Sequence, residues 1–146
     1  MDVAALVTWL ATALGGFVLL GTWISKGGVR QAQTGQSRFP PAVIFGHFLL
    51  AAVGLVLWIV FLASDESSGL AWTSFVILIV VALLGFAMLA RWLAGRRATA
   101  AAGVRTTADV DPTVPAEQRF PLPVVVVHGL LGATTLVLVL LAALTL

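Results

Sequence analysis

Two histidines, His47 and His128, are the only ionisable side chains that lie well inside the long apolar stretches of this 146-residue chain. A neutral imidazole can bind a metal ion, donate or accept a hydrogen bond, or take up a proton near neutral pH. An ionisable group inside a membrane segment is costly and is by default a functional hypothesis. The two histidines are therefore the first candidates for chemistry in this chain.

The rest of the sequence offers little other chemistry. The absence of cysteine excludes disulfides, thiolate metal sites, iron–sulfur clusters and cysteine nucleophiles. We find no nucleophile triad, P-loop or pair of carboxylates. Two histidines without a nearby Asp, Glu or Cys make a poor zinc site, which usually has three or four protein ligands. The eight Lys and Arg residues mostly flank apolar stretches, so the basic balance is not evidence for a nucleic-acid partner.

The same local sequence precedes both histidines. Residues 38–47 read RFPPAVIFGH and residues 119–128 read RFPLPVVVVH, so Arg-Phe-Pro is followed in each case by six residues and then His. The offset between the two segments is 81 residues. Self-similarity of this kind is the usual sign of an internal repeat.

A second match extends the repeat. Gly16 and Trp23 recur as Gly85 and Trp92, at an offset of 69 residues. The shorter offset is explained by a longer connection in the second half. The sequence therefore predicts a duplicated helical hairpin, with repeat 1 at residues 1–69 and repeat 2 at residues 70–146.

Four apolar stretches predict the elements that must position the histidines. Hydrophobic residues make up 60% of the chain and charged residues only 10%, where a soluble domain typically carries about 25%. About 20 helical residues at 1.5 Å each match a hydrocarbon core about 30 Å thick. We expect an all-α integral membrane protein, one domain over residues 1–146, forming an up-down bundle of four helices at residues 3–24, 42–63, 70–93 and 122–146.

The connections predict the orientation of the bundle. Connections 25–41 and 94–121 are basic, whereas the second connection contains Asp65 and Glu66 and no basic residue. By the positive-inside rule, the two basic connections are cytoplasmic and both termini are outside. We expect 94–121 to be a mobile linker, except for a short helical extension of the third span through Arg97, because its prolines argue against regular structure.

Aromatic residues near the span ends are expected at the membrane interfaces, where tryptophan is common. Trp23 and Trp92 would mark the inner interface, and Trp58 and Trp72 the outer one. Phe39 and Phe120 would be interface anchors as well.

Both histidines are predicted at the same depth. Each lies about six residues past the start of its helix, hence about 9 Å from the cytoplasmic side. In an up-down bundle the second and fourth helices lie on one diagonal, about 11–14 Å apart, which leaves room for a metal between two imidazoles. Gly16 and Gly85 fall at about the same level on the other two helices, and small residues follow each histidine at helical spacing.

This arrangement predicts a porphyrin between two imidazoles. We expect one haem b per chain near the cytoplasmic face, bound without covalent attachment because there is no CxxCH motif. His47 and His128 would be the axial ligands. The other residues expected at the cofactor are Gly16, Gly85, Ala51, Gly54 and Gly132, with Arg38 and Arg119 as counter-charges for the propionates.

The pattern resembles the four-helix haem core of membrane b-type cytochromes, including cytochrome b and the cytochrome b561-like proteins. The resemblance implies axial histidines on the second and fourth helices and glycines on the first and third, which here are His47, His128, Gly16 and Gly85. Those families usually carry a second histidine pair about four turns further along. The corresponding positions here are near Phe61 and Ala142, which cannot bind iron, so the resemblance implies a single haem.

Two axial histidines leave no free position on the iron, which favours one-electron transfer over stand-alone enzyme activity. The leading hypothesis is a bacterial plasma-membrane cytochrome that exchanges electrons with quinol or a partner redox protein. One alternative is a non-redox haem-binding module: a carrier, a sensor or an accessory subunit of a respiratory complex. Another is a structural membrane subunit with hydrogen-bonding histidines. Small residues on several helix faces leave room for a homo-oligomer.

Overall fold

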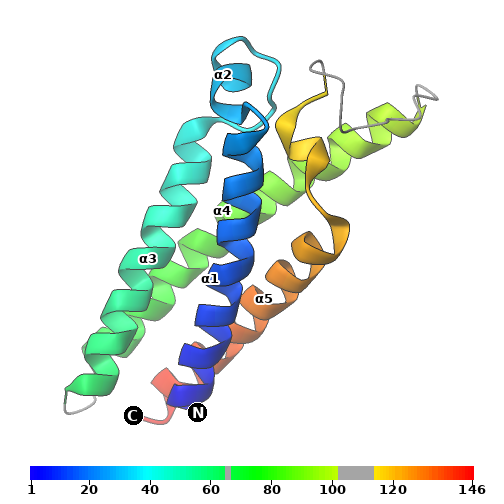
Figure 1. Ribbon diagram of the computed structural model, residues 1–146. Helices are drawn as coiled ribbons and strands as arrows, with labels where there is room; N and C mark the ends of the chain where they lie inside the picture. The colour runs from blue at the N-terminus through cyan, green and yellow to red at the C-terminus, as the bar shows by residue number, and fades with distance from the viewer. Residues whose placement is uncertain (65–66, 102–113) are drawn as a thin grey trace.

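The computed structural model describes residues 1–64, 67–101 and 114–146. Within this part of the chain, four helices are long and apolar enough to cross a membrane, and they pack as a bundle (Figure 1). They are α1 (Asp2–Ser25), α3 (Pro41–Ala63), α4 (Ser68–Ala101) and α5 (Leu122–Leu144). Two short helices, α2 (Gly28–Gln33) and η1 (Ala116–Arg119), lie in the connections. The prediction of a multi-pass, all-α membrane protein is confirmed.

Prolines determine where the two histidine-bearing helices begin. Pro41 is the first residue of α3 and Pro123 is the second residue of α5, and each helix is also preceded by a proline at the N-cap. Proline is favoured at such positions because the first N–H groups of a helix have no partner inside the helix. His47 and His128 are each six residues past the start, hence about 9 Å along the helix axis. The expected common depth of the histidines follows from these two starts.

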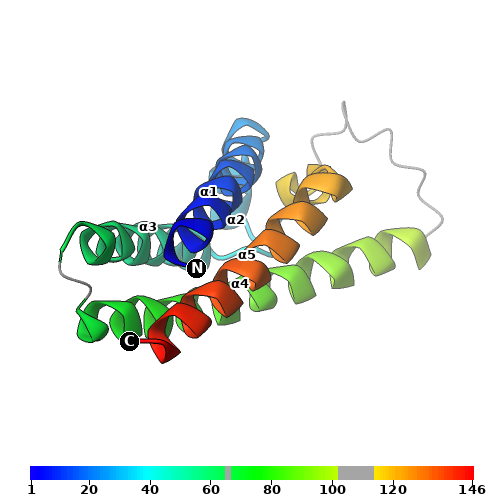
Figure 2. The same cartoon turned by 90° about the horizontal axis from the view of Figure 1, so that it is seen from below.

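The four helices run up and down, with both termini at the same end (Figure 1). α1 packs most extensively on α5, α3 on α4, and α4 also contacts α5, so α3 and α5 lie on one diagonal and α1 and α4 on the other (Figure 2). We call the end with α2 and η1 the basic end and the opposite one the terminal end. The basic end carries Lys26, Arg30, Arg38, Arg91, Arg96, Arg97 and Arg119.

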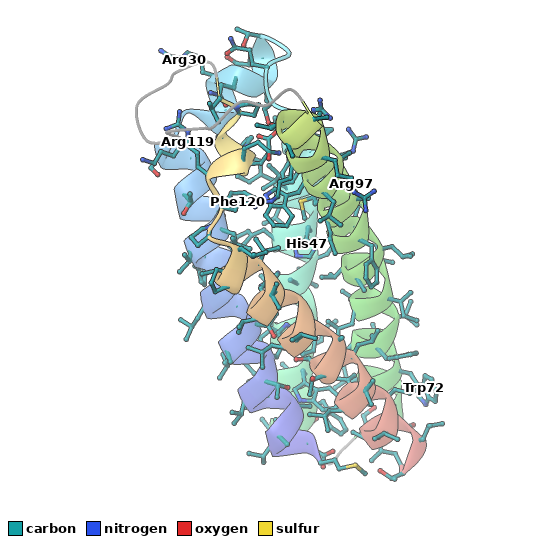
Figure 3. The ribbon with its side chains drawn as sticks, turned by 90° about the vertical axis from the view of Figure 1, so that its right-hand side faces the viewer. Arg30, His47, Trp72, Arg97, Arg119 and Phe120 are labelled. Carbon is teal, nitrogen blue, oxygen red and sulfur yellow. The ribbon has the colours of Figure 1, made fainter. Side chains whose placement is uncertain are left out.

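The interior is narrow and the outside is apolar. Leu14, Leu83 and Phe86 are each more than 60% exposed, as expected for side chains that face lipid. Two buried clusters fill the bundle. The basic cluster contains Trp23, Phe39, Ile44, Trp92 and Ala116, and the terminal cluster contains Trp9, Trp58, Phe61, Leu78 and Val139 with smaller neighbours. By their positions along α3 and α5, the histidines lie between the two clusters, as Figure 3 shows for His47.

The third connection differs from the predicted mobile linker. α4 continues to Ala101, beyond the expected end at Arg97, and residues 102–113 lie outside the described residues. Ala116 and Glu117 are fully buried at the basic end. The prediction of a solvated linker is therefore wrong for residues 114–121.

Side chains from the first connection explain this packing. The Gln31 side chain donates from Nε2 to the carbonyl of Val114 at 3.2 Å and accepts from the backbone N–H of Ala116 at 2.7 Å. Gln31 lies on α2, a helix that the sequence pattern did not predict. Buried backbone groups outside regular structure need such partners, and the side chain supplies them.

The structure shows which way the aromatic residues face, and their place at the membrane interfaces stays a prediction. Trp23, Trp58 and Trp92 lie near helix ends but face the interior, with at most 3% exposure, whereas Trp72 is 40% exposed. Phe39 is buried and packs edge to face on Phe120. Large rings therefore form part of the interior, and some of them pack directly on glycine. One example is Trp23, whose indole lies directly on Gly28.

Candidate functional site

The rings of His47 on α3 and His128 on α5 lie close together across one diagonal of the bundle. Their ring centroids are 6.2 Å apart and the ring planes are inclined by 57°. Both rings are partly buried. The bundle therefore brings together the two side chains that the sequence singles out, although they are 81 residues apart.

Each imidazole is held by a backbone carbonyl of the helix on which its own helix packs. Nδ1 of His47 lies 2.9 Å from the carbonyl oxygen of Val81 on α4, and Nδ1 of His128 lies 2.9 Å from that of Thr12 on α1. A carbonyl oxygen can only accept, so Nδ1 must carry the hydrogen. In a neutral imidazole the lone pair is then on Nε2. Histidines that bind metals usually make this kind of second hydrogen bond, which fixes the ring and its tautomer.

A glycine lies beside each ring, one helical turn after the carbonyl acceptor. A Cβ atom added to Gly16 would be 3.3 Å from Cε1 of His128, and one added to Gly85 would be 3.3 Å from Cε1 of His47. The two glycines and two histidines thus share one level, as expected. The role of the glycines at a cofactor stays a prediction.

The two half-sites make matching contacts. The 69-residue offset that relates Gly16 to Gly85 also relates Thr12 to Val81, the two carbonyl acceptors. The 81-residue offset relates the two histidines, and it also relates Phe39 to Phe120, whose ring centroids are 6.0 Å apart. Corresponding residues therefore meet at two levels of the bundle. The sequence analysis missed the carbonyls of Thr12 and Val81, although their spacing of four residues before each glycine was readable.

The other small residues expected at the cofactor lie in different surroundings. A Cβ atom on Gly54 would be 3.0 Å from Cζ2 of Trp9, so Gly54 accommodates an indole of the terminal cluster. One on Gly132 would be 3.7 Å from Cγ2 of Thr12, the residue that holds His128. Ala51 is half-buried on α3, one turn from His47. Of these three residues, Gly54 therefore packs in the terminal cluster and not beside a histidine.

Arg38 and Arg119 lie at the basic end, just before the histidine-bearing helices. The backbone of Arg38 is held on both sides, since its N–H donates to Oε1 of Glu117 at 2.7 Å and its carbonyl accepts from Nη1 of Arg91 at 3.1 Å. The Arg38 side chain is exposed, and Arg119 is half-buried in η1. Contacts of these two guanidinium groups with a cofactor stay predictions.

The positions corresponding to a second histidine pair are occupied by tightly packed core. Phe61 is fully buried and Ala142 is 1% exposed. The rings of Trp58 and Phe61 have centroids 4.7 Å apart, and the Trp58 indole donates to the carbonyl of Asp2 at 3.2 Å. The terminal half of the interior is therefore filled by the protein's own aromatic side chains.

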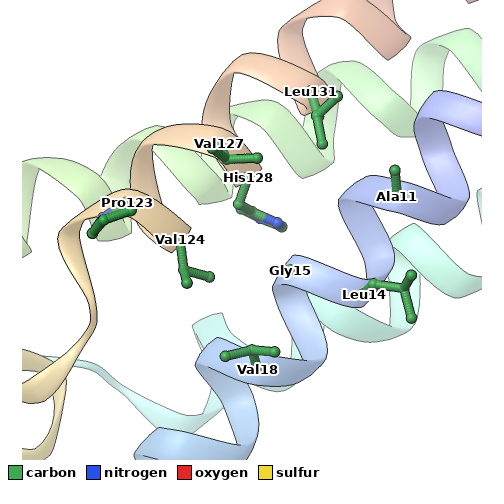
Figure 4. A pocket seen from close by; sticks show the side chains of 9 residues that line it. All are labelled: Ala11, Leu14, Gly15, Val18, Pro123, Val124, Val127, His128 and Leu131. Carbon is green, nitrogen blue, oxygen red and sulfur yellow. The ribbon is translucent and has the colours of Figure 1, made fainter.

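An apolar groove of about 340 Å³ runs between α1 and α5 and reaches His128 (Figure 4). Leu14 and Val18 line it from α1, and Val124 and Leu131 from α5. Figure 4 shows the His128 ring pointing across the groove toward α1, near Gly15. The groove is thus a lateral depression with an imidazole at one point of its wall.

The two imidazoles suit a metal whose other ligands belong to a cofactor. Among the described residues, no group of three or more His, Cys, Asp or Glu side chains could hold a metal ion. Two imidazoles bound to one metal through Nε2, with bonds of about 2.0 Å and about 1 Å from each nitrogen to its ring centre, would have centres about 6 Å apart. The observed separation is 6.2 Å. The centroid separation therefore matches that of two imidazoles on one metal, and the binding of a metal cofactor stays a prediction.

Comparison of this chain with protein-family models, with curated proteins and with solved structures found no match.

Proposed function

We propose that this protein is a membrane b-type cytochrome that binds one haem between α3 and α5, near the basic end, and transfers single electrons. The observation that carries the proposal is the spacing of the two histidines. Their ring centroids are separated by the distance expected for two imidazoles on one iron, and each ring already has its Nδ1–H committed to a carbonyl.

Each residue of the site has a distinct task in this proposal. His47 and His128 would hold the iron through Nε2. The carbonyls of Val81 and Thr12 fix the orientation of the rings and raise the basicity of Nε2. A bound haem supplies the one-electron chemistry, while the surrounding protein sets its orientation and potential.

The roles of the residues around the two imidazole rings follow from the size and charge of their side chains. Gly16 and Gly85 keep side chains away from the space beside the imidazoles, because even a methyl group there would be in tight contact. Ala51 and Gly132 leave room one turn further along. Arg38 and Arg119 provide positive charge at the end of the bundle nearer the haem, where propionates would need partners.

The proposal also covers the origin of the bundle by duplication and its orientation in the membrane. The matching contacts of the two half-sites support a duplicated hairpin with repeats at residues 1–69 and 70–146. The basic connections support a cytoplasmic location for the basic end, with both termini outside. The electron partner is then quinol in the bilayer or a redox protein, and the membrane is a bacterial plasma membrane.

The visible spectrum of the purified protein after haem-replete expression tests the assignment. We expect the sharp Soret and α bands of six-coordinate low-spin haem after reduction with dithionite. His47→Ala and His128→Ala should each lose most of the haem or give a five-coordinate spectrum. Gly46→Ala and Gly129→Ala are matched controls, because each is adjacent to a histidine and a Cβ atom there has no neighbour within 4 Å. Both controls should keep the parental spectrum, and two histidine variants that also kept it would refute the ligand assignment.

A structural role for the histidines is the second candidate. It is favoured by the hydrogen bonds to Val81 and Thr12, which join α3 to α4 and α5 to α1 without any cofactor. Such bonds between membrane helices are worth about 0.6 kcal/mol on average. A colourless wild-type protein whose two histidine variants unfold more easily would support this candidate and reject the cytochrome.

A further inference from the structure

The two tryptophans that correspond in the repeat, Trp23 and Trp92, differ in their hydrogen bonds. Both are buried, with at most 3% exposure, and both belong to the basic cluster. Nε1 of Trp23 donates to Oγ of Ser37 at 3.5 Å. Among the described residues, none accepts a hydrogen bond from Nε1 of Trp92. One indole N–H of the pair is therefore satisfied within the described chain, and the other is not.

The hydrogen bond of Trp23 leads to a carboxylate. Oγ of Ser37, which accepts from the indole, donates in turn to Oε2 of Glu117 at 2.9 Å. The Glu117 side chain is fully buried. A buried anion therefore lies at the end of the hydrogen-bonded series that begins at Trp23.

This series has no counterpart at Trp92. The 81-residue offset relates Ser37 to Gln118 and Gln36 to Glu117. The Gln118 side chain donates from Nε2 to the backbone carbonyl of Trp92 at 3.4 Å, and it does not accept from the indole. Gln36 is exposed and uncharged. The position that corresponds to the Glu117 carboxylate thus supplies no anion.

The surroundings of Trp92 favour an acceptor with negative charge. The N–H of a buried tryptophan usually has a partner, and an unsatisfied buried donor in a native structure needs an explanation such as a ligand. Cζ of Arg96 lies 5.0 Å from the centroid of the Trp92 ring, and Arg91 precedes Trp92 in α4. Because these nearby charges are positive, an anionic acceptor is favoured over a neutral one.

Trp92 lies on the face of α4 that contacts His47. Val81, Gly85 and Trp92 follow one another at spacings of four and seven residues, which puts them on one face of the helix. Trp92 is seven residues past Gly85, hence about 10 Å nearer the basic end. Its cluster also contains Ile44, one turn before His47 on α3. A ligand at the histidines that extends two turns toward the basic end would come to the level of this indole.

We propose that Nε1 of Trp92 donates a hydrogen bond to a carboxylate of the ligand that the two histidines hold. This inference rests on the proposed haem, whose propionates are the carboxylates concerned. A propionate would serve Trp92 as the Glu117 carboxylate serves Trp23 through Ser37. Trp92 is thus a positioning residue that directs the propionate edge of the porphyrin toward the basic end.

The indole N–H signals of the wild-type protein test the proposal. Protein with ¹⁵N-labelled tryptophan is compared without haem, with reduced haem, and with the reduced dimethyl ester of haem, in which both carboxylates are blocked. Haem and its ester have the same ring, so a difference between them reports on the carboxylates. We expect the Trp92 N–H to exchange more slowly with water, and to resonate further downfield, with haem than with the ester. The Trp23 N–H should be the same with both.

Binding to a variant gives a second measurement. Trp92→Phe, which also identifies the Trp92 signal, removes the N–H and keeps an aromatic ring. We expect it to bind haem about ten- to a hundredfold more weakly than wild type, as for the loss of a hydrogen bond to a charged group, and to bind the ester as tightly as wild type. Trp23→Phe is the matched control, because its N–H is bonded within the protein. It should change the affinities for haem and ester by the same factor.

The outcomes separate this inference from the proposed function. Equal Trp92 signals with haem and with ester, in a protein with the low-spin spectrum, would overturn the inference and leave the cytochrome standing. A Trp92 N–H that is protected without haem and exposed in Gln118→Ala would identify Gln118 as the acceptor, and would also overturn it. A wild type that binds neither porphyrin would refute the cytochrome and this inference together.

Discussion

Gly16 on α1 lies against the ring of His128 on α5, and a Cβ atom added to Gly16 would be 3.3 Å from Cε1. Gly85 and His47 have the same relationship on the other side of the bundle. Each imidazole is thus confined between a carbonyl that holds Nδ1 and a glycine one turn further along the same neighbouring helix. A closely packed protein interior accommodates an added side chain only when the neighbouring atoms move.

Gly16→Leu and Gly85→Leu are therefore expected to displace the facing imidazole and remove most of the bound haem. Overpacking typically costs about 1–3 kcal/mol, which four apolar helices in a bilayer should tolerate. The measurement is the ratio of Soret absorbance to protein, together with helix content by circular dichroism. Gly21→Leu is the control on α1, since its Cβ would have no neighbour within 4 Å. A Gly16→Leu protein with unchanged haem content would show that the space beside His128 is not part of a haem site.

Much of this geometry was predictable, because it depends on regular spacing along helices. Hydropathy located the four spans, and α3 and α5 begin within one residue of the expected starts. Once Pro40 and Pro121 fix those starts, six helical residues place both histidines at one depth. The internal repeat then indicated that Gly16 and Gly85 would be at the same level.

What the sequence did not predict depends on polar contacts between distant residues. Gln31 bonds to residues 114 and 116, which are 83 and 85 residues away, and neither helical periodicity nor the 81-residue repeat pairs Gln31 with them. A glycine at helical spacing from His47 looks the same in the sequence whether it faces a cofactor or an indole. Gly54 faces Trp9.

Gly54→Ala tests this reassignment. A methyl group there would be 3.0 Å from Cζ2 of Trp9 and 3.1 Å from Cγ2 of Ile77, so we expect the protein to be less stable by about 1–3 kcal/mol. The haem spectrum of the folded protein should be unchanged. Thermal unfolding in detergent and the Soret band measure the two effects separately. Gly46→Ala on the same helix is the control, and a shifted Soret band in Gly54→Ala alone would place Gly54 back at the cofactor.

Glu117 connects the third connection to the start of α3. Its carboxylate is fully buried and accepts from the Arg38 backbone N–H at 2.7 Å and from Oγ of Ser37 at 2.9 Å. Glu117→Ala removes both acceptors, and a buried donor left without a partner costs about 1–3 kcal/mol. We expect a corresponding loss of stability in thermal unfolding, and a smaller loss for Glu117→Gln, which keeps one carbonyl oxygen.

Gln36→Ala is the control for Glu117, because Gln36 is the exposed residue that corresponds to it at the 81-residue offset. It should leave the unfolding midpoint unchanged. If Glu117→Ala were as stable as Gln36→Ala, residues 114–121 would not be anchored through this carboxylate.

The orientation in the membrane can be measured directly because the chain has no cysteine of its own. Ser67 is exposed at the terminal end, and Gln33 is exposed at the basic end. A basic end in the cytoplasm predicts that a membrane-impermeant maleimide labels Ser67→Cys in intact cells and labels Gln33→Cys only after permeabilisation. The reverse labelling pattern would put the basic end, and with it the proposed haem, on the outer side of the membrane. Since His47 and His128 lie about 9 Å along their helices from the basic end, this result also decides from which side a soluble redox partner would approach.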